Sequence, residues 1–342
     1  MNPQKSYRFT FTILIITLII IWFLNVSLGS VSIPLKDIFS SILEGNASKD
    51  SWHTIVVNVR IPKALTAIMV GAGLSVSGLL MQTLFRNPLA GPFVLGISSG
   101  ASLGVALLIL GTSLFGGITF ASTSSFGMAI AASLGSFLVL SAVLIAANKI
   151  RNTMSILIIG LMFGSLTSAI ISVLVYFSSA EQLQQFIFWG FGSLGNLSWN
   201  ELAIFGVLFF IGIAFMLFII KPLNSMLLGE NYAKSMGVNM KRTRNYILIT
   251  TSILTGVITA FSGPIAFVGL AVPHLTKLIF DTSDHKILIP AVLICGAILM
   301  LVADMIAQMP MSEYTLPINA ITSLFGAPIV IWLLVRKRKM YV

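Results

Sequence analysis

The feature that most constrains this chain is a series of long apolar runs that contain no Asp, Glu, Lys or Arg. A helix needs about 20 predominantly apolar residues to cross the hydrocarbon core of a bilayer. Membrane-spanning strands would alternate in polarity, which these uniform runs do not do, so helices are expected. The runs cover residues 9–35, 64–85, 87–148, 152–180, 182–200, 202–220, 245–276, 287–303 and 314–335.

Local breaks divide the longest runs. Gly111-Thr112 and Ala121–Ser125 split run 87–148, and Ser262-Gly263-Pro264 splits run 245–276 because proline lacks an amide proton. Segment 182–200 is rich in Gln, Gly, Ser and Asn and is expected to be a loop with short helical pieces. The sequence therefore predicts an all-α polytopic membrane protein, one domain over residues 1–342. Its ten expected spans lie near 9–28, 62–85, 93–110, 126–147, 153–177, 201–220, 244–262, 265–281, 287–308 and 316–335.

The first apolar run also resembles a secretory signal. Lys5 and Arg8 precede it, and Ser27-Leu28-Gly29 has the small-x-small pattern of a cleavage site. Its apolar core, Phe9–Leu24, is longer than the usual 7–15 residues. We expect an uncleaved first helix.

The charged residues indicate topology. Only 9% of the chain is charged and 57% is hydrophobic, whereas soluble domains carry about 25% charged residues. This excludes a cytosolic enzyme and a nucleic-acid-binding domain, despite the net charge of +10. With both termini in the cytoplasm, 16 of the 20 Lys and Arg residues lie on the inner side, as the positive-inside rule requires, and suit contact with anionic lipid. The outer exceptions are Lys36, Lys49, Arg60 and Lys63.

Motifs of catalysis are missing from the sequence. No G-x-x-x-x-G-K-[ST] loop is present, and the small-residue stretch Gly96–Gly104 is better interpreted as a close helix-packing surface. His53, His274 and His285 lack metal-ligand spacing, and the single Cys295 excludes an intrachain disulfide. We expect no catalytic residues and no metal site, and a membrane enzyme is the weaker alternative.

Asp304 is the main ionisable residue within the expected spans, near the outer end of the ninth. It is either an interfacial residue satisfied by a neighbour or a residue with a pore or docking role. Proton-coupled carriers usually need ionisable groups at mid-membrane. A stand-alone carrier is therefore poorly supported, and energy is expected to come from another protein.

Two helix breaks have a similar pattern. Arg86–Pro92 follows the second span and Ser262–Pro264 follows the seventh, and Gly91–Gly96 resembles Gly263–Gly269. Paired Gly/Pro-interrupted segments indicate internally repeated transporters. The alternative is that Gly and Pro are simply frequent in transmembrane helices.

The longest polar inner segment is 221–244. Pro222 suits a first helical turn, Gly229 and Gly237 can each end a short helix, and apolar residues recur at 3–4 spacing. Two short amphipathic helices at the membrane surface are expected. They form either an ordinary basic loop or a platform for a cytoplasmic partner.

Arg60 and Lys63 lie three residues apart, so a helix beginning there places them on one face. They either snorkel to the interface or receive acidic groups of a docking protein.

Taken together, these segments resemble the permease subunits of binding-protein-dependent ABC importers for iron–siderophore complexes, haem and cobalamin. The resemblance extends from Val57 to Arg338. The segments that carry it are Arg60–Lys63, Gly71–Leu74 with Gly78 and Gln82, Arg86–Pro92, Leu95–Ala101, Leu228–Ala233, Gly263–Gly269, Pro273-His274, Asp284–Lys286, Leu316-Pro317 and Gly326–Pro328.

The resemblance implies a type II ABC importer permease-like fold in the bacterial cytoplasmic membrane. It implies a second permease copy, identical or closely related, two cytoplasmic ATPase subunits and an extracytoplasmic substrate-binding protein. The chain would bind no cofactor and catalyse no reaction, because ATP-Mg would be bound by the partner ATPase.

The resemblance also assigns roles to individual residues. Arg60 and Lys63 match an outer basic pair that receives glutamates of the binding protein, and Gln308 falls where some relatives have a further arginine. Two further sets of residues match the cytoplasmic gate and the coupling segment of the family. Asn87, Leu89 and Thr153 match the cytoplasmic gate, and Gly229, Glu230, Ala233 and Gly237 match the segment that couples to the ATPase.

The implied function is inward movement of an iron(III)–siderophore complex by alternating access. Import of cobalamin or haem by the same architecture is the alternative, and a secondary transporter is a more distant one.

Overall fold

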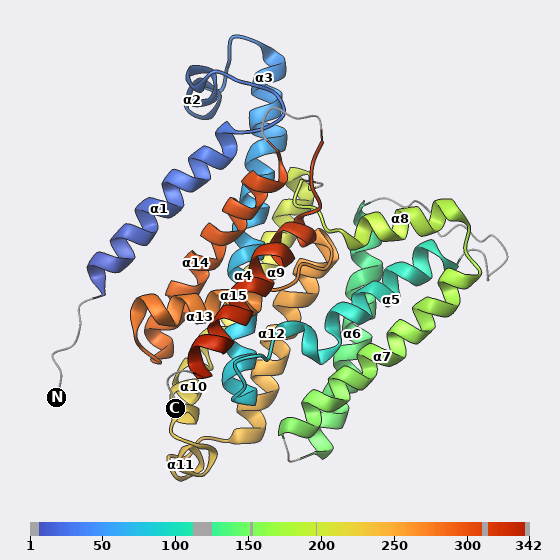
Figure 1. Ribbon diagram of the computed structural model, residues 1–342, viewed down its shortest axis with the longest axis vertical. Coiled ribbons are helices and arrows are strands. Elements are labelled where there is room, and N and C mark those ends of the chain that lie inside the picture. The colour runs from blue at the N-terminus through green and yellow to red at the C-terminus, as the bar shows by residue number, and fades with distance from the viewer. Residues whose placement is uncertain (1–6, 112–124, 151–152, 196, 310–313, 339–342) are drawn as a thin grey trace.

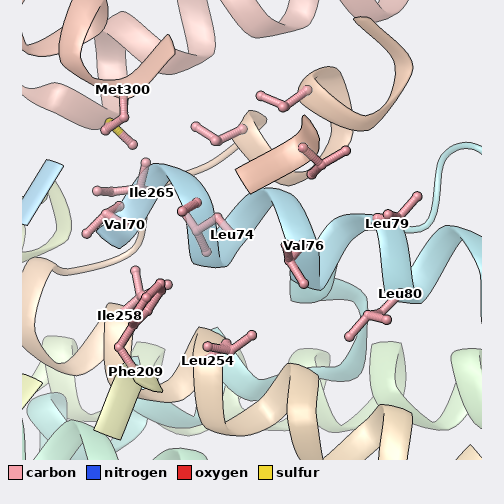
Figure 2. Close-up of a cluster of buried hydrophobic side chains, with 14 of the residues drawn as sticks. Val70, Leu74, Val76, Leu79, Leu80, Phe209, Leu254, Ile258, Ile265 and Met300 are labelled. Carbon is pink, nitrogen blue, oxygen red and sulfur yellow. The ribbon is translucent and has the colours of Figure 1, made fainter. Parts of the chain in front are cut away.

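One helix, α4 (Ile61–Phe85), runs through the middle of the molecule with other helices packed around most of its length (Figure 1). The computed structural model describes residues 7–111, 125–150, 153–195, 197–309 and 314–338. Val70, Leu74 and Leu80 of α4 are fully buried, and side chains of the neighbouring helices approach α4 from both sides (Figure 2). The core therefore follows the axis of α4.

Every regular element in the described ranges is helical, which confirms the predicted fold class. The first half contains α1 (Arg8–Ser27), α2 (Leu35–Leu43), α3 (Asp50–Ile55), the π-helical turn η1 (Val56–Arg60), α4, the 3₁₀ turn η2 (Pro92–Leu95), α5 (Ile97–Ile109), α6 (Ser125–Lys149) and α7 (Thr153–Tyr176). The second half contains α8 (Ala180–Gly190), α9 (Trp199–Leu217), α10 (Ile220–Leu227), α11 (Glu230–Ser235), α12 (Met240–Ser262), α13 (Val268–Phe280), α14 (His285–Ala307) and α15 (Ile318–Arg338).

Within the described residues, seven helical stretches are long and apolar enough to cross a membrane. Three shorter apolar helices, α5, α13 and the Ile318–Trp332 part of α15, occupy the remaining expected positions. The expected loop at 182–200 begins with α8, whose first turn is capped by Ser179. The segment expected to divide run 87–148 falls mostly at 112–124, outside the described residues.

The predicted start of the second span, near residue 62, is wrong. The helix is continuous from Asp50 to Phe85, because α3 and α4 are joined through η1. Pro62 has no amide proton to donate within a helix, and the single π turn η1 directly precedes this discontinuity. The sequence analysis placed a helix start at Arg60–Lys63, whereas the helix passes through this segment.

The predicted lengths of the third and eighth spans are also wrong. Each of α5 and α13 has 13 residues, which is about 20 Å of helix and less than the roughly 30 Å hydrocarbon core. Gly96 and Phe267, with positive φ angles of 72° and 66°, immediately precede these helices. The left-handed residues turn the chain, and the helix that follows each break segment is short.

The two halves repeat the same order of elements. α4 ends at Arg86, which has a positive φ angle, and is followed by a break and α5. Likewise, α12 ends at Gly263, which also has a positive φ angle, and is followed by a break and α13. The start of α13 packs on α4, where Gly269 meets Gly78, and Ile97 at the start of α5 lies beside Gly256 of α12. Each short helix therefore packs on the long helix of the other half, as in internally repeated transporters.

Small residues allow backbones to approach closely at the helix crossings. Gly71 of α4 meets the Gly296 carbonyl of α14, so no Cβ fits at this crossing. Gly100 of α5 likewise meets the Gly135 carbonyl of α6. This confirms the interpretation of the Gly96–Gly104 stretch as a packing surface.

We predict that Gly78→Ala destabilises the fold, because the added Cβ would overlap the Gly269 carbonyl oxygen. A cost of about 1–3 kcal/mol is typical of overpacking. The measurement is the thermal unfolding midpoint of the chain in detergent. Gly206→Ala in α9 is the control, since the nearest atom to its added Cβ is Met69 Sδ at 4.0 Å. Equal midpoints for the two variants would show that the α4–α13 crossing is not tight.

Candidate functional site

A cavity of about 620 Å³ opens at the end of the bundle that carries α2 and α3, called here the α3 end. Its wall includes Arg60, Lys63 and Gln308, the three residues predicted for docking. They come from η1, α4 and the C-cap of α14. The structure therefore brings the predicted docking residues together around one opening.

Arg60 is directed into the protein and is only 7% exposed. Its Nη1 donates hydrogen bonds to the carbonyl oxygens of Val26 (3.0 Å) and Ser27 (2.8 Å), and its Nη2 donates to that of Val31. A cation at the C-terminus of a helix satisfies its last carbonyl groups and interacts favourably with its dipole. Arg60 thus fastens the end of α1 to η1, and its role in docking stays a prediction.

Lys63 is paired with Asp304, with 3.1 Å between Nζ and Oδ1. The other carboxylate oxygen of Asp304 accepts hydrogen bonds from Asn25 Nδ2 (3.0 Å) and Gln308 Nε2 (2.6 Å). These four residues are called the Asp304 cluster. Asp304 is buried and fully satisfied by neighbours, which supports the first of its two interpretations. The sequence indicated that this carboxylate was unusual, but nothing in it identified Asn25 as a partner.

We predict that Asp304→Ala lowers the unfolding midpoint more than Lys63→Met does. Removing Asp304 takes away the partner of Gln308 Nε2, one of the two acceptors of Asn25 Nδ2 and the counter-charge of Lys63, whereas removing Lys63 leaves the carboxylate with both amide donors. Breaking a buried pair can cost about 3–5 kcal/mol, and the loss at Lys63 is smaller because its side chain is 20% exposed. Thermal unfolding of both variants measures the difference. Equal losses would mean that the amide donors do not support the carboxylate.

The coupling segment, residues 221–244, lies at the opposite end of the bundle, called here the α10 end (Figure 1). As predicted, it contains two short helices, α10 and α11, and it continues into the start of α12. Gly229 and Gly237 have positive φ angles of 114° and 84°, and no atom lies within 4 Å of a Cβ built on either. These two glycines are therefore needed for their backbone conformation, which other residues rarely adopt, and not to leave room for a neighbouring side chain.

The apolar residues of this segment divide between the core and the exposed surface, and the predicted position of the two helices at the membrane surface stays a prediction. Leu223 and Met226 of α10 are buried in the core. Other apolar side chains are exposed together at the tip of the segment. These are Leu227, Leu228, Tyr232 and Met236, which are 48–64% exposed and are called here the apolar tip.

The remaining coupling residues differ in exposure. Glu230 begins α11 and is partly exposed, whereas Ala233 is fully buried. Ala233 can contribute to the seating of α11 but not to a surface contact. The coupling role of Gly229, Glu230, Ala233 and Gly237 stays a prediction.

Two of the three predicted gate residues lie in the gate loop, Arg86–Gly91, at the α10 end. Asn87 Oδ1 accepts a hydrogen bond from the Leu89 backbone N–H (2.9 Å), and the Leu89 side chain is 44% exposed. Thr153 begins α7, and its side chain lies outside the described residues. The structure therefore brings Asn87 and Leu89 together, and the gate assignment stays a prediction.

Sequence reasoning missed a polar chain at the α10 end, made of Thr83, Asn224, Asp284 and His285 and called here the His285 chain. These residues come from α4, α10 and the start of α14. Their hydrogen bonds join positions 60 to 202 residues apart in sequence. Local periodicity carries no signal for such contacts.

In the part of the chain that the structure describes, no group of three or more His, Cys, Asp or Glu side chains is placed so that it could bind a metal ion.

Comparison with known proteins gives a consistent result over the whole chain. The FecCD transport family profile matches residues 17–336. The chain is 34% identical to the hemin transport system permease protein HmuU of Yersinia pestis over 99% of both chains. It is 36% identical to the vitamin B12 import system permease protein BtuC of Klebsiella pneumoniae over 82% of both.

Solved structures agree with this result. The chain superposes with a TM-score of 0.81 and 32% identity on a structure described as an inward-facing conformation of an ABC transporter of metal-chelate type, over 95% of this chain and 98% of that one. PsaBC from Streptococcus pneumoniae, solved in complex with Fab, gives a TM-score of 0.52 at 17% identity, covers 79% of this chain and 89% of that one, and shows likeness of fold alone.

Proposed function

Because this chain belongs to the FecCD transport family, we propose that it is the permease subunit that moves an iron(III)–siderophore complex inward across the bacterial cytoplasmic membrane. Family membership makes the chain a multi-pass ABC importer permease of the iron-chelate, haem and vitamin B12 type. One observation carries the proposed coupling of an outer partner to an inner one: the apolar tip and the docking cavity lie at opposite ends of one buried helix pair, α4 and α14.

The charge distribution supports a cytoplasmic α10 end. Arg86, Lys221, Lys234, Lys241 and Arg242 are exposed there, and loops rich in Lys and Arg stay in the cytoplasm. In this orientation the cavity at the α3 end opens to the outside, and both termini are cytoplasmic.

The apolar tip fits a cleft in a cytoplasmic ATPase. Exposed apolar side chains on a short helix are the usual anchors of helix-in-groove recognition. Two ATPase subunits, one under this chain and one under a second permease copy, would bind ATP-Mg and close. The permease itself would form and break no covalent bond, since its task is to change which end of the pathway is open.

The cavity at the α3 end fits an acidic docking surface. Lys63 is the more exposed member of its ion pair, and Asp304 keeps two amide donors without it. A carboxylate of an extracytoplasmic substrate-binding protein can therefore pair with Lys63 at little cost to Asp304. Complementary charge of this kind accelerates encounter and fixes orientation.

The cargo proposal rests on the metal-chelate description of the structure that matches 95% of this chain. Haem or cobalamin is the alternative, because the curated relatives carry the names hemin and vitamin B12. A proton-driven carrier has less support, since the buried carboxylate of Asp304 is already neutralised by Lys63.

We predict that Glu230→Arg uncouples the ATPase. The substitution reverses the charge in the first turn of α11, beside the apolar tip. Importer complex purified through a tag on this chain is expected to lose bound ATPase or its ATP hydrolysis. Glu181→Arg, in the first turn of α8 at the other end, is the control. Unchanged ATPase content and hydrolysis in Glu230→Arg would remove the coupling assignment.

We predict that Lys63→Met weakens association with the binding protein by about three- to tenfold at low salt, through loss of a steering charge. The measurement is the dissociation constant at low and high ionic strength. Lys36→Met, which removes an exposed cation from α2, is the control. If Lys63→Met keeps both the affinity and the salt dependence of the native chain, the docking assignment fails.

A further inference from the structure

The coupling segment is joined to the transmembrane core through a defined set of hydrogen bonds. Asn224 of α10 donates from Nδ2 to Asp284 Oδ1 (2.6 Å), and its Oδ1 accepts from the His285 backbone N–H (2.8 Å). The same oxygen lies 2.8 Å from His285 Nδ1. On the far side of the ring, Nε2 lies 2.9 Å from Thr83 Oγ1 of α4. One buried imidazole thus bridges α10 and α4.

The direction of each hydrogen bond follows from its partners. A carboxylate only accepts, so Asn224 must present its NH₂ group to Asp284 and its oxygen to His285. His285 therefore carries its proton on Nδ1, and in the neutral ring Nε2 is the acceptor. Nε2 therefore needs a hydroxyl donor, and the single hydroxyl proton of Thr83 serves it when it is turned away from the Leu79 carbonyl oxygen, which lies 2.9 Å from Thr83 Oγ1. The His285 chain of hydrogen bonds is complete only when residue 83 carries an O–H group.

A second tie runs alongside the His285 chain. Arg86, the residue that ends α4, donates from Nη2 to the Met226 carbonyl oxygen of α10 (3.2 Å). Beyond Arg86, the gate loop is held from its other side, because His274 Nε2 of α13 lies 2.8 Å from the Pro88 carbonyl oxygen. The loop therefore lies between a contact to the coupling segment and a contact to α13.

Burial makes these contacts rigid. His285 is 1% exposed, and Leu223 and Met226 on the inner face of α10 are 0% and 3% exposed. The buried apolar face holds α10 against the core, and the part-buried hydrogen bonds of the His285 chain fix its angle and position, since leaving the buried imidazole unpaired is costly. In contrast, the apolar tip, only a few residues away, is exposed.

We propose that Thr83, His285 and Asn224 are positioning residues of import, which transmit the movement of the coupling segment to the end of α4 and the gate loop. This inference rests on the proposed function. Thr83 lies on α4 and is not a residue of the apolar tip, and its side chain is linked to α10 through the His285 chain. It provides a test that leaves the ATPase contact unchanged.

The discriminating variants are Thr83→Val, which keeps the side-chain shape but removes the hydroxyl, and Thr83→Ser, which retains it. Thr12→Val is the matched control, because Thr12 Oγ1 donates to the Arg8 carbonyl oxygen four residues back in its own helix, the same local acceptor position that Leu79 offers Thr83. Each variant is purified as the full importer complex with its ATPase and reconstituted into proteoliposomes. The readout is ⁵⁵Fe-labelled ferric siderophore taken up per ATP hydrolysed.

Thr83→Val is expected to keep its ATPase and basal hydrolysis but to transport several-fold less cargo per ATP. Thr83→Ser and Thr12→Val are expected to match the native chain. A double variant with Asn224→Ala is expected to be no worse than the more defective single variant, because both substitutions break one chain. Native uptake per ATP in Thr83→Val, or additive losses in the double variant, would overturn the proposal.

A second readout requires no cargo. Amide hydrogen exchange of α10 and the last turn of α4 is measured on the permease chain in lipid nanodiscs. We expect exchange about tenfold faster in Thr83→Val than in Thr12→Val, the effect of one lost buried hydrogen bond. Equal exchange would overturn the link. Absence of ATP-driven uptake in the native complex, with exchange altered as expected, would instead overturn the proposed function.

Discussion

The close antiparallel packing of α4 against α14 is the contact on which the rest of the structure depends. In a bilayer, lipid tails compete equally for apolar side chains, so helices associate where small residues let backbones meet. Gly71 and Gly296 provide this approach at the middle of the pair. Polar contacts then close both ends, Lys63 with Asp304 at one and Thr83 with His285 at the other. The pair is therefore a continuous unit from the docking cavity to the coupling segment.

The second long helix, α12, has an equivalent relationship with the first half. It packs on α6, where Gly256 lies beside Ser136, and Arg244 donates to the Ile150 carbonyl oxygen at the α10 end. Each half thus supplies a long helix that packs against helices of the other half. Such an exchange leaves few independent hinges inside the bundle. Under the proposed function, the movement of alternating access falls between this chain and a second permease copy and at the short break segments, which end at the positive-φ residues Gly96 and Phe267.

The sequence predicted those features that depend on local composition. Charge-free runs identified the helices and their approximate number, and the glycines at 229 and 237 identified the two coupling helices. The π turn before Pro62 and the shortness of α5 and α13 were missed, because hydropathy does not register how a chain turns inside the membrane. The partners of Asp304 and His285 were also missed. They are set by helix pairs distant in sequence, and single polar residues in apolar runs do not indicate which neighbour will satisfy them.

The central claim, that this chain is the permease of a ferric-chelate importer, is tested most directly by uptake in cells. A strain lacking the gene is compared with the same strain after the gene is restored, using labelled ferric siderophores, haem and cobalamin. The account predicts selective loss of ferric-siderophore uptake, recovered on restoration. Loss of cobalamin or haem uptake alone would contradict the proposed cargo but not the proposed import mechanism. Unchanged uptake of all three compounds would contradict the proposal that this chain is part of such an importer.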